Sequence, residues 1–307
     1  MLKNGSFAWD LRVPVIAAPM FLVSGPDLVV EACRAGIVGT FPALNQRTSD
    51  GYAAWLDEIE GRLAVPSSEA IAPFGVNLVV HRNNERLAAD LRITVEHRVP
   101  LVITSLGIDA GVIEAIQAYG GRVFHDVVTL RHAEKAAAAG VDGLIAVCAG
   151  AGGHGGLLNP FAFVSEIRSF FDGTIVLGGA ISTGRQVAAA RMLGADFAYM
   201  GTRFIATRES MAPDGYKAML VASTAAAIVY TPAVSGVPGN FLRPSLLAAG
   251  VDPDRTERAE AFDFGTGEIK AWRDVWSAGQ GVGQIRDIPT TAALVAALAD
   301  DYQAARS

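Results

Sequence analysis

The chain has 307 residues, of which 51% are hydrophobic and 18% charged, with a formal net charge of −6. This composition supplies a large core and excludes a disordered chain, and the acidic balance argues against a general nucleic-acid binder, which presents a basic face. Cys33 and Cys148 are too few for a disulfide framework. No apolar run has the length of a membrane span, and the N-terminus lacks a signal-peptide core. We therefore expect a cytoplasmic protein without membrane segments.

Eight short apolar segments follow one another along the chain and are interpreted as buried strands. They cover residues 13–20, 37–44, 74–80, 100–106, 122–127, 143–147, 174–180 and 197–204. Segments with helical spacing of apolar residues alternate with them, over 26–35, 49–62, 84–97, 110–119, 130–139, 161–171 and 184–193, and a last helix is predicted over 290–304. This alternation is typical of an α/β protein whose parallel sheet is covered by helices.

Eight strand–helix units are the number that closes a (β/α)8 TIM barrel. The alternative is an open doubly wound sheet, which usually carries a Gly-x-Gly-x-x-Gly fingerprint after its first strand. Here the first strand ends in Ala17-Ala18-Pro19-Met20. The sequence therefore favours the barrel.

The eighth unit is interrupted over residues 206–277. A helix-like segment over 216–229 is followed by turns rich in proline and glycine and by a polar helix candidate over 253–262. No strand periodicity is evident there. We expect a small, mostly helical inserted lid at 206–277, with the barrel formed by 1–205 and 278–307.

A glycine-rich segment, 149–156, follows the predicted strand 143–147 and contains His154. Glycine permits positive φ angles and the close approach of the backbone to a ligand. Taken alone, the segment is equally well interpreted as a flexible turn. Because active sites of such barrels lie at the carboxyl ends of the strands, we examined what the other strand ends offer.

The strand ends supply a set of polar and glycine-containing positions: Ala18, Pro19, Met20, Asn77, Thr104, Ser105, His125, Asp126, His154, Gly178, Gly179, Ala180, Gly201 and Thr202. Two glycine-containing turns leave the neighbouring seventh and eighth strands and enter helices. Such turns present backbone N–H groups to an anion, so they predict a phosphate site, with tight strand–helix packing as the alternative. His125 either touches the ligand or is a satisfied core histidine.

Five motifs carry a family resemblance: PVIAAPM, FGVNL, AGGHGG, VLGGAISTGRQVAAARMLGADFAYMGTRFIATRES and AGQGVG. Together they resemble the nitronate monooxygenase family, formerly called 2-nitropropane dioxygenases, which is similar to FMN-dependent enoyl-acyl-carrier-protein reductases and NADH:quinone reductases. The resemblance implies a TIM barrel that binds FMN non-covalently, and it is less specific for one activity within this superfamily.

The resemblance also implies roles for individual residues. Ala18, Pro19 and Met20 match a segment against the isoalloxazine ring, Asn77 matches a contact to its polar edge, and Gly152 matches a backbone contact. The implied phosphate-binding turns contain Gly178, Gly179, Ala180, Met200, Gly201 and Thr202, and His125 is a further candidate for cofactor contact. His154 matches the active-site histidine, either as a base towards the carbon acid or as an anchor for the nitronate charge.

Three positions depart from the family pattern. Asp126 stands where some relatives carry lysine, and an inward-pointing carboxylate there would repel a phosphate dianion. Tyr199 replaces glutamine and Val147 replaces a polar residue. These differences cluster around the implied flavin site and leave the substrate open.

Some other residues carry weaker expectations. Tyr230 and Ser235 are candidates for substrate contact, whereas Trp272 and Trp276 are expected to pack the insertion onto the barrel. Cys148 has no evident partner base. No histidine pair has metal-ligand spacing and no Cys-x-x-Cys occurs, so no metal site is predicted.

Three functions follow as hypotheses. The first is an FMN-dependent nitronate monooxygenase that uses O2 and releases carbonyl compounds and nitrite. The second is an NAD(P)H-dependent FMN reductase of the quinone or enoyl type, and the third is a flavin-binding or phosphate-binding barrel with little turnover. The oligomeric state stays open, with a homodimer as one option.

Overall fold

The computed structural model describes residues 9–67, 70–254, 273 and 275–307. Its main feature is a closed barrel of eight parallel strands in chain order, in which the last strand pairs with the first. The strands are β1 (Val15–Ala17), β2 (Val38–Pro42), β3 (Phe74–Val79), β4 (Leu101–Ser105), β5 (Arg122–Val127), β6 (Gly143–Val147), β8 (Thr174–Gly178) and β9 (Phe197–Met200). The predicted TIM barrel is confirmed.

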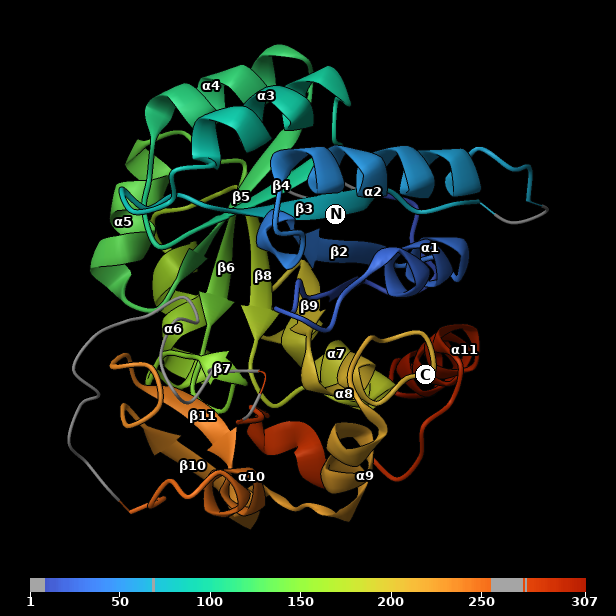
Figure 1. Cartoon of the computed structure of the whole chain (residues 1–307), viewed down its shortest axis with the longest axis vertical. Coiled ribbons are helices and arrows are strands. Elements are labelled where there is room, and N and C mark those ends of the chain that lie inside the picture. Colours follow the sequence, from blue (N-terminus) through green and yellow to red (C-terminus); the bar gives the residue numbers. More distant parts are fainter. Residues whose placement is uncertain (1–8, 68–69, 255–272, 274) are drawn as a thin grey trace.

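Helices surround this barrel (Figure 1). They are α1 (Pro26–Arg34), α2 (Ser49–Leu63), α3 (Leu87–Glu96), α4 (Ala110–Ala118), α5 (Leu130–Ala138), α6 (Pro160–Arg168), α7 (Gly184–Met192) and α11 (Thr291–Ala304). Side chains that accept hydrogen bonds from the first turn fix several helix starts, as Thr129 does for α5 and Asn159 for α6. Within the described ranges, no helix has both the length and the apolar character needed to cross a bilayer.

The inside of the barrel is filled by apolar side chains that alternate with outward-facing ones along each strand. This inner core contains Ile16, Val38, Leu101, Ile103, Phe124, Ile145, Val176 and Phe197. Trp9 packs against it, with its ring centroid 6.0 Å from that of Phe124 and 5.6 Å from that of Phe197. The filled interior leaves the carboxyl ends of the strands as the place for a ligand.

The inserted segment contains two strands besides its helices, although the sequence shows no strand periodicity there. Helix α9 (Asp214–Ala222) ends before the predicted boundary, and β10 (Ile228–Thr231) pairs antiparallel with β11 (Gly239–Leu242). Residues 228–231 are β-branched or aromatic, which favours a strand. The proline- and glycine-rich stretch between β10 and β11 forms the hairpin turn. Helix α10 (Arg243–Ala248) follows. The polar helix candidate at 253–262 lies almost wholly outside the described residues, as does Trp272.

The eighth strand is also shorter than predicted. It ends at Met200, and the four-residue helix α8 (Thr202–Ile205) begins two residues later, after Gly201. Trp276 stacks on Tyr216 of α9, with ring centroids 5.0 Å apart and planes 9° from parallel. Both residues belong to the inserted segment, so this stack joins α9 to the chain that returns to the barrel, and the predicted packing of the insertion onto the barrel stays a prediction.

Two aspartates hold the amino-terminal ends of neighbouring strands in register. Asp142 donates its backbone N–H to Val123 O (2.8 Å), and its Oδ2 accepts from Val123 N (2.9 Å). Asp196 makes the same pair of bonds with Ile175, at 2.6 and 2.9 Å. Each aspartate stands two residues after a glycine that ends a helix, with one apolar residue between them. Each therefore aligns the strand that follows it with the preceding strand of the barrel.

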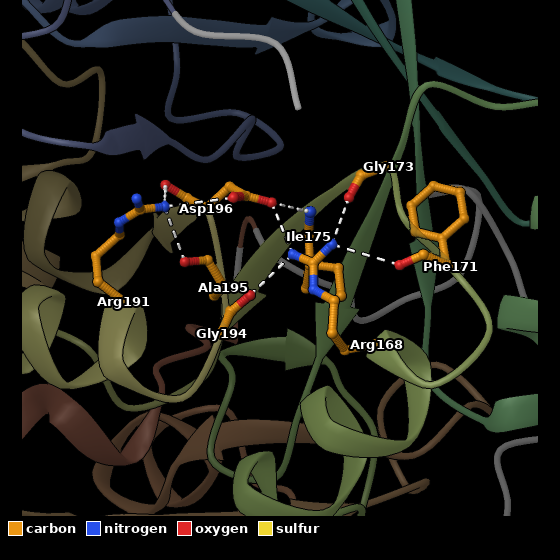
Figure 2. Close-up of polar contacts among 8 residues, drawn as sticks. All are labelled: Arg168, Phe171, Gly173, Ile175, Arg191, Gly194, Ala195 and Asp196. Atoms are coloured by element: carbon orange, nitrogen blue, oxygen red, sulfur yellow. Dashed lines mark hydrogen bonds and ion pairs between the residues drawn. The ribbon is translucent and has the colours of Figure 1, made fainter. Parts of the chain in front are cut away.

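Figure 2 shows how two arginines complete the second of these contacts. Arg168 donates to Asp196 Oδ2 (2.8 Å) and to the backbone oxygens of Phe171, Gly173 and Gly194. Arg191 donates to Ala195 O (3.0 Å) and lies 3.4 Å from Asp196 Oδ1. The aspartate thus joins α6, α7 and the starts of β8 and β9, at the end of the barrel remote from the strand carboxyl ends.

We expect Asp196→Ala to lower the free energy of unfolding by about 2–4 kcal/mol, because it leaves Ile175 N–H without its acceptor and the Arg168 guanidinium without its carboxylate partner. Urea unfolding followed by circular dichroism measures this change. The matched control is Asp172→Ala at an exposed position, which we expect to change stability by no more than about 0.5 kcal/mol. Equal unfolding midpoints for the two variants would contradict the assigned role of Asp196.

Candidate active site

A cavity of about 810 Å³ lies at the carboxyl ends of the barrel strands, within the range of small-molecule sites in proteins. It collects most of the positions predicted from the sequence. The predicted residues that line it are Ala18, Pro19, Met20, Asn77, His125, Gly152, His154, Gly178, Gly179, Ala180, Gly201 and Thr202. Residues from every barrel strand or the turn after it therefore converge on one site.

Met200 is the predicted position whose side chain does not line this cavity. It packs in the outer core between the barrel and helices α7 and α11, because successive side chains of a strand point to opposite faces and Tyr199 points inward. Its backbone oxygen accepts from Ala18 N at 3.0 Å. Met200 therefore positions the end of β1.

His154 is held in place by the inserted segment. With Gly153 it forms the two-residue strand β7 (Gly153–His154), which pairs antiparallel with Gly239 and Asn240 of β11. Asn240 Nδ2 also donates to Ala151 O at 2.7 Å. The glycine-rich segment is thus the third strand of a small sheet, and the flexible-turn alternative does not describe it.

A hydrogen-bond chain orients the imidazole of His154. Its Nε2 lies 2.9 Å from Oγ of Ser235, and that hydroxyl donates to Val237 O at 3.1 Å. A Ser235 hydroxyl whose single proton goes to this carbonyl oxygen accepts a hydrogen bond from His154 Nε2–H, and in that tautomer Nδ1 is the basic nitrogen. Ser235 is 2% exposed, so the predicted substrate-side candidate is in fact a buried partner of the histidine.

Burial lowers the pKa of His154 to about 4, because the desolvated imidazolium is disfavoured. The histidine is therefore neutral at pH 7. Since its folded-state pKa lies below the unfolded value of about 6.5, the unfolded chain takes up the proton first. Acidification from about pH 6.5 towards pH 4 consequently costs stability.

The side chain of His125 lies on the outer face of β5, away from the barrel axis. Its Nδ1 lies 2.8 Å from the hydroxyl of Thr104. Burial and then the charges of His132 and Lys135 lower its pKa to about 4. His125 lines the cavity and also has a hydrogen-bond partner in the core. Its position thus combines features of both sequence interpretations, a residue of the ligand site and a satisfied core histidine.

Asn77 is oriented by its neighbours on β4. Its Nδ2 donates to Ile103 O and to Ser105 Oγ, each at 3.1 Å. Both amide protons are used by these acceptors, so the group left to meet a ligand is the Oδ1 acceptor. Asn77 can therefore bind a ligand N–H.

The two turns after β8 and β9 differ in how they can bind an anion. Several N–H groups at the start of α7 already have acceptors, since Gln186 Oε1 accepts from Ser182 and Thr183, and Asp301 Oδ2 accepts from Arg185. An anion-binding role at β8 therefore falls to the turn itself, where Gly179 and Ala180 have φ angles of +135° and +56°.

The segment that returns from the insertion covers these turns, and sequence reasoning missed its contacts. Gly279 N donates to Thr202 Oγ1 (2.9 Å), Gln280 N donates to Gly150 O (2.9 Å), and Ser182 Oγ donates to Gly281 O (3.0 Å). A Cβ on Gly279 would lie 2.5 Å from Gly150 O. The motif AGQGVG was visible in the sequence, but its partners lie about 100 residues away and leave no local signal.

Cys148 and Arg203 take structural positions. Cys148 is buried, which raises the pKa of its thiol to about 12, so it is a protonated thiol at neutral pH. Arg203 is 5% exposed and binds Asp287 Oδ1 at 2.6 Å. No cluster of three or more metal-ligating side chains occurs in the part of the chain that the structure describes.

This geometry defines a TIM-barrel enzyme whose site lies at the carboxyl ends of the strands. The family model for nitronate monooxygenase matches residues 6–301, so the chain belongs to the nitronate monooxygenase family. It is an oxidoreductase of the flavin-dependent kind that acts on a small molecule.

Individual relatives are distant. A nitronate monooxygenase from Paraburkholderia phytofirmans is 28% identical over 303 residues, covering 82% of this chain and 80% of that protein. A (3aS,4S,5R,7aS)-5-hydroxy-7a-methyl-1-oxo-octahydro-1H-indene-4-carboxyl-CoA dehydrogenase from Rhodococcus jostii is 28% identical over 234 residues, covering 76% and 64%.

Two solved structures have the same architecture. Nitroalkane oxidase from Streptomyces ansochromogenes gives a TM-score of 0.83 at 25% identity, covering 97% of this chain and 98% of that one. FabK from Thermotoga maritima gives a TM-score of 0.77 at 23% identity, covering 96% and 94%. The second likeness shows the fold alone.

We expect nitrogen-detected NMR of the histidine side chains to show His154 as the neutral tautomer with its proton on Nε2 at pH 7. The imidazole should become protonated only near pH 4, because burial disfavours its charged form. The variant His154→Gln identifies the resonance by its loss. Titration at the ordinary value of about 6.5, or a proton on Nδ1, would contradict the assigned hydrogen-bond chain.

Proposed function

We propose that the protein is an FMN-dependent nitronate monooxygenase that oxidises alkyl nitronates with O2 to carbonyl compounds and nitrite. The overall change balances when two nitronate anions and one O2 give two carbonyl compounds and two nitrite ions. The observation that carries the choice of substrate is the position of His154, which is half-buried in the cavity, hydrogen-bonded to Ser235 and neutral at pH 7 because desolvation lowers its pKa to about 4. A base with a pKa of about 4 is a weak acceptor of a carbon-bound proton, so a substrate that is already an anion suits the site better than a neutral nitroalkane.

FMN is supported by the chemistry of the cavity lining. Asn77 offers an acceptor, which suits the N3–H of a flavin ring. The turns at 178–180 and 201–202 approach the cavity without bulky side chains, which suits a phosphate group. Bound FMN would supply the electron-accepting chemistry. The residues of this chain would hold its ring and phosphate and place the substrate carbon.

His154 would act by position and hydrogen bonding. Ser235 holds the imidazole with Nε2 protonated, and the sheet of β7, β10 and β11 fixes the backbone that carries it. Tyr230 of β10 lines the same cavity and donates its hydroxyl to Gly155 O at 3.3 Å. Together they would cover the substrate and separate it from bulk water.

A reductase or dehydrogenase acting on a thioester is the second candidate. The relative in Rhodococcus jostii, whose name specifies a carboxyl-CoA substrate, favours it. His132 and Lys135 of α5, both exposed, line the cavity on one side and could meet an anionic part of such a substrate or of NAD(P)H.

Anaerobic stopped-flow mixing decides between the two. The purified yellow protein would be mixed separately with propyl nitronate and with NADH or NADPH, and the oxidised-flavin absorbance followed. We expect rapid bleaching by the nitronate and none by the pyridine nucleotides. His154→Ala should keep FMN and lose activity by roughly a hundredfold or more. Bleaching by a pyridine nucleotide alone would overturn the proposal in favour of a reductase, and wild-type rates in His154→Ala would remove the histidine from the mechanism.

We expect Gly201→Val to fold normally and to bind FMN roughly tenfold more weakly or worse, because its side chain would occupy the space proposed for the phosphate. Gly201 has a φ of −99°, and a Cβ there would meet Met20 Sδ no closer than 3.6 Å, so the protein itself tolerates it. Gly179, with positive φ, offers no such clean test. The control is Gly61→Val, at a helix position with nothing within 4 Å of the added Cβ. Thermal melts check the fold, and full flavin occupancy in Gly201→Val would refute the phosphate position.

A further inference from the structure

Asp126 is a carboxyl group at the floor of the cavity that the proposed reaction does not use. It lies on β5, two residues after Phe124, which packs in the inner core of the barrel. Residues two apart on a strand point to the same face, so Asp126 points inward, and it lines the cavity with Tyr199 and Val147. Its Oδ1 is buried and has no hydrogen-bond partner among the described residues.

The groups around Asp126 do not neutralise a carboxylate. Tyr199 of β9 interacts with it electrostatically, and burial raises the pKa of that phenol well above its ordinary value. The neighbours that line the cavity from β3, β4 and β6 are Asn77, Ser105 and Val147, which do not titrate. His132 and Lys135 of α5 also line the cavity, and their charges act on His125, which faces the other side of β5.

Burial therefore sets the ionisation of this group and raises the pKa of Asp126 to about 7. Near neutral pH a large fraction of the molecules carry a protonated carboxyl. A protonated carboxyl has one O–H donor, whereas a carboxylate only accepts. A buried acid kept neutral by its surroundings is a known means of donating a hydrogen bond inside an active site.

We propose that Asp126 in its neutral form donates a hydrogen bond to an acceptor atom of the flavin ring. The proposal rests on the proposed function in that it takes FMN to occupy this cavity. The carbonyl oxygens and unprotonated nitrogens of oxidised flavin are hydrogen-bond acceptors. They can accept from the O–H of a protonated Asp126, whereas an ionised Asp126 is itself an acceptor and repels them. Protonation also removes the charge that would repel the phosphate dianion, which was the concern raised by an inward-facing aspartate.

Proton binding and flavin binding are then linked. The protonated enzyme binds FMN more tightly, so bound FMN raises the pKa of Asp126 further. The dissociation constant is flat below about pH 7 and rises by up to about tenfold per pH unit above it, because each binding event must then take up a proton.

The test follows flavin release from the purified, full-length holoenzyme. Samples are diluted at pH values from about 6 to about 9, and the fluorescence of released FMN gives the dissociation constant. The variants are Asp126→Asn, whose amide donates at every pH, and Asp126→Leu, which has no donor. Dividing each wild-type value by that of Asp126→Asn at the same pH cancels the ionisation of the FMN phosphate, whose second pKa is about 6.

We expect the wild-type dissociation constant to rise above about pH 7 and that of Asp126→Asn to lack this rise. Asp126→Leu should bind roughly tenfold more weakly than wild type at pH 6. Asp172→Asn, a control at an exposed position, should keep the wild-type profile. Circular dichroism verifies the fold, and Asp126→Asn alone carries the test if Asp126→Leu does not fold.

The outcomes separate this proposal from the proposed function. The same pH profile in wild type and Asp126→Asn overturns the role of Asp126, and nitronate turnover then still stands on its own test. An Asp126-dependent profile in an enzyme that is inert towards nitronates supports the role of Asp126 and overturns the function. A wild-type protein that holds no FMN at any pH overturns both.

Discussion

The pairing of β7 with β11 is the contact on which the candidate site depends. A segment in which five of eight residues are glycine loses more conformational entropy on ordering than any other composition, so it does not fix a catalytic side chain by itself. Backbone pairing with Gly239 and Asn240, and the Asn240 side chain on Ala151 O, supply that order from a distant part of the chain. The inserted segment is therefore part of the candidate site.

The two ends of the barrel have different roles. At the amino-terminal end, Asp142 and Asp196 use charged side chains to fix strand register. Arg168 and Arg191, the partners of Asp196, also donate to backbone oxygens near the ends of α6 and α7. At the carboxyl end, glycine, alanine and polar residues at or just after the strand ends line the cavity. Stability and function are thus served by different residues, as is usual in barrels of this kind.

The barrel could be predicted because its signals are local. Apolar runs, helix spacing and glycine stops such as Gly140 and Gly194 recur in each unit, and the strand predicted at 122–127 has the same limits in the structure. The cavity residues followed from the rule that strand ends meet. The hairpin of β10 and β11 was missed because its strands have four residues each, too few to show a period, although the run Ile228-Val229-Tyr230-Thr231 has β-forming composition. The bond between His154 and Ser235 spans 81 residues and leaves no trace in local sequence.

Burial has one common effect on the ionisable groups of the cavity floor. It lowers the pKa of His154 and His125 to about 4 and raises that of Asp126 to about 7, so each is driven towards its neutral form. An anion held against these three groups is met by hydrogen-bond donors, whereas the exposed Lys135 places a positive charge along one side of the cavity. Backbone N–H groups keep their polarity at every pH, whereas a side-chain cation would be suppressed by the same burial. The glycine-containing turns are therefore the physically consistent anion-binding element of this cavity, and side chains such as His154 and Asp126 contribute direction in place of charge.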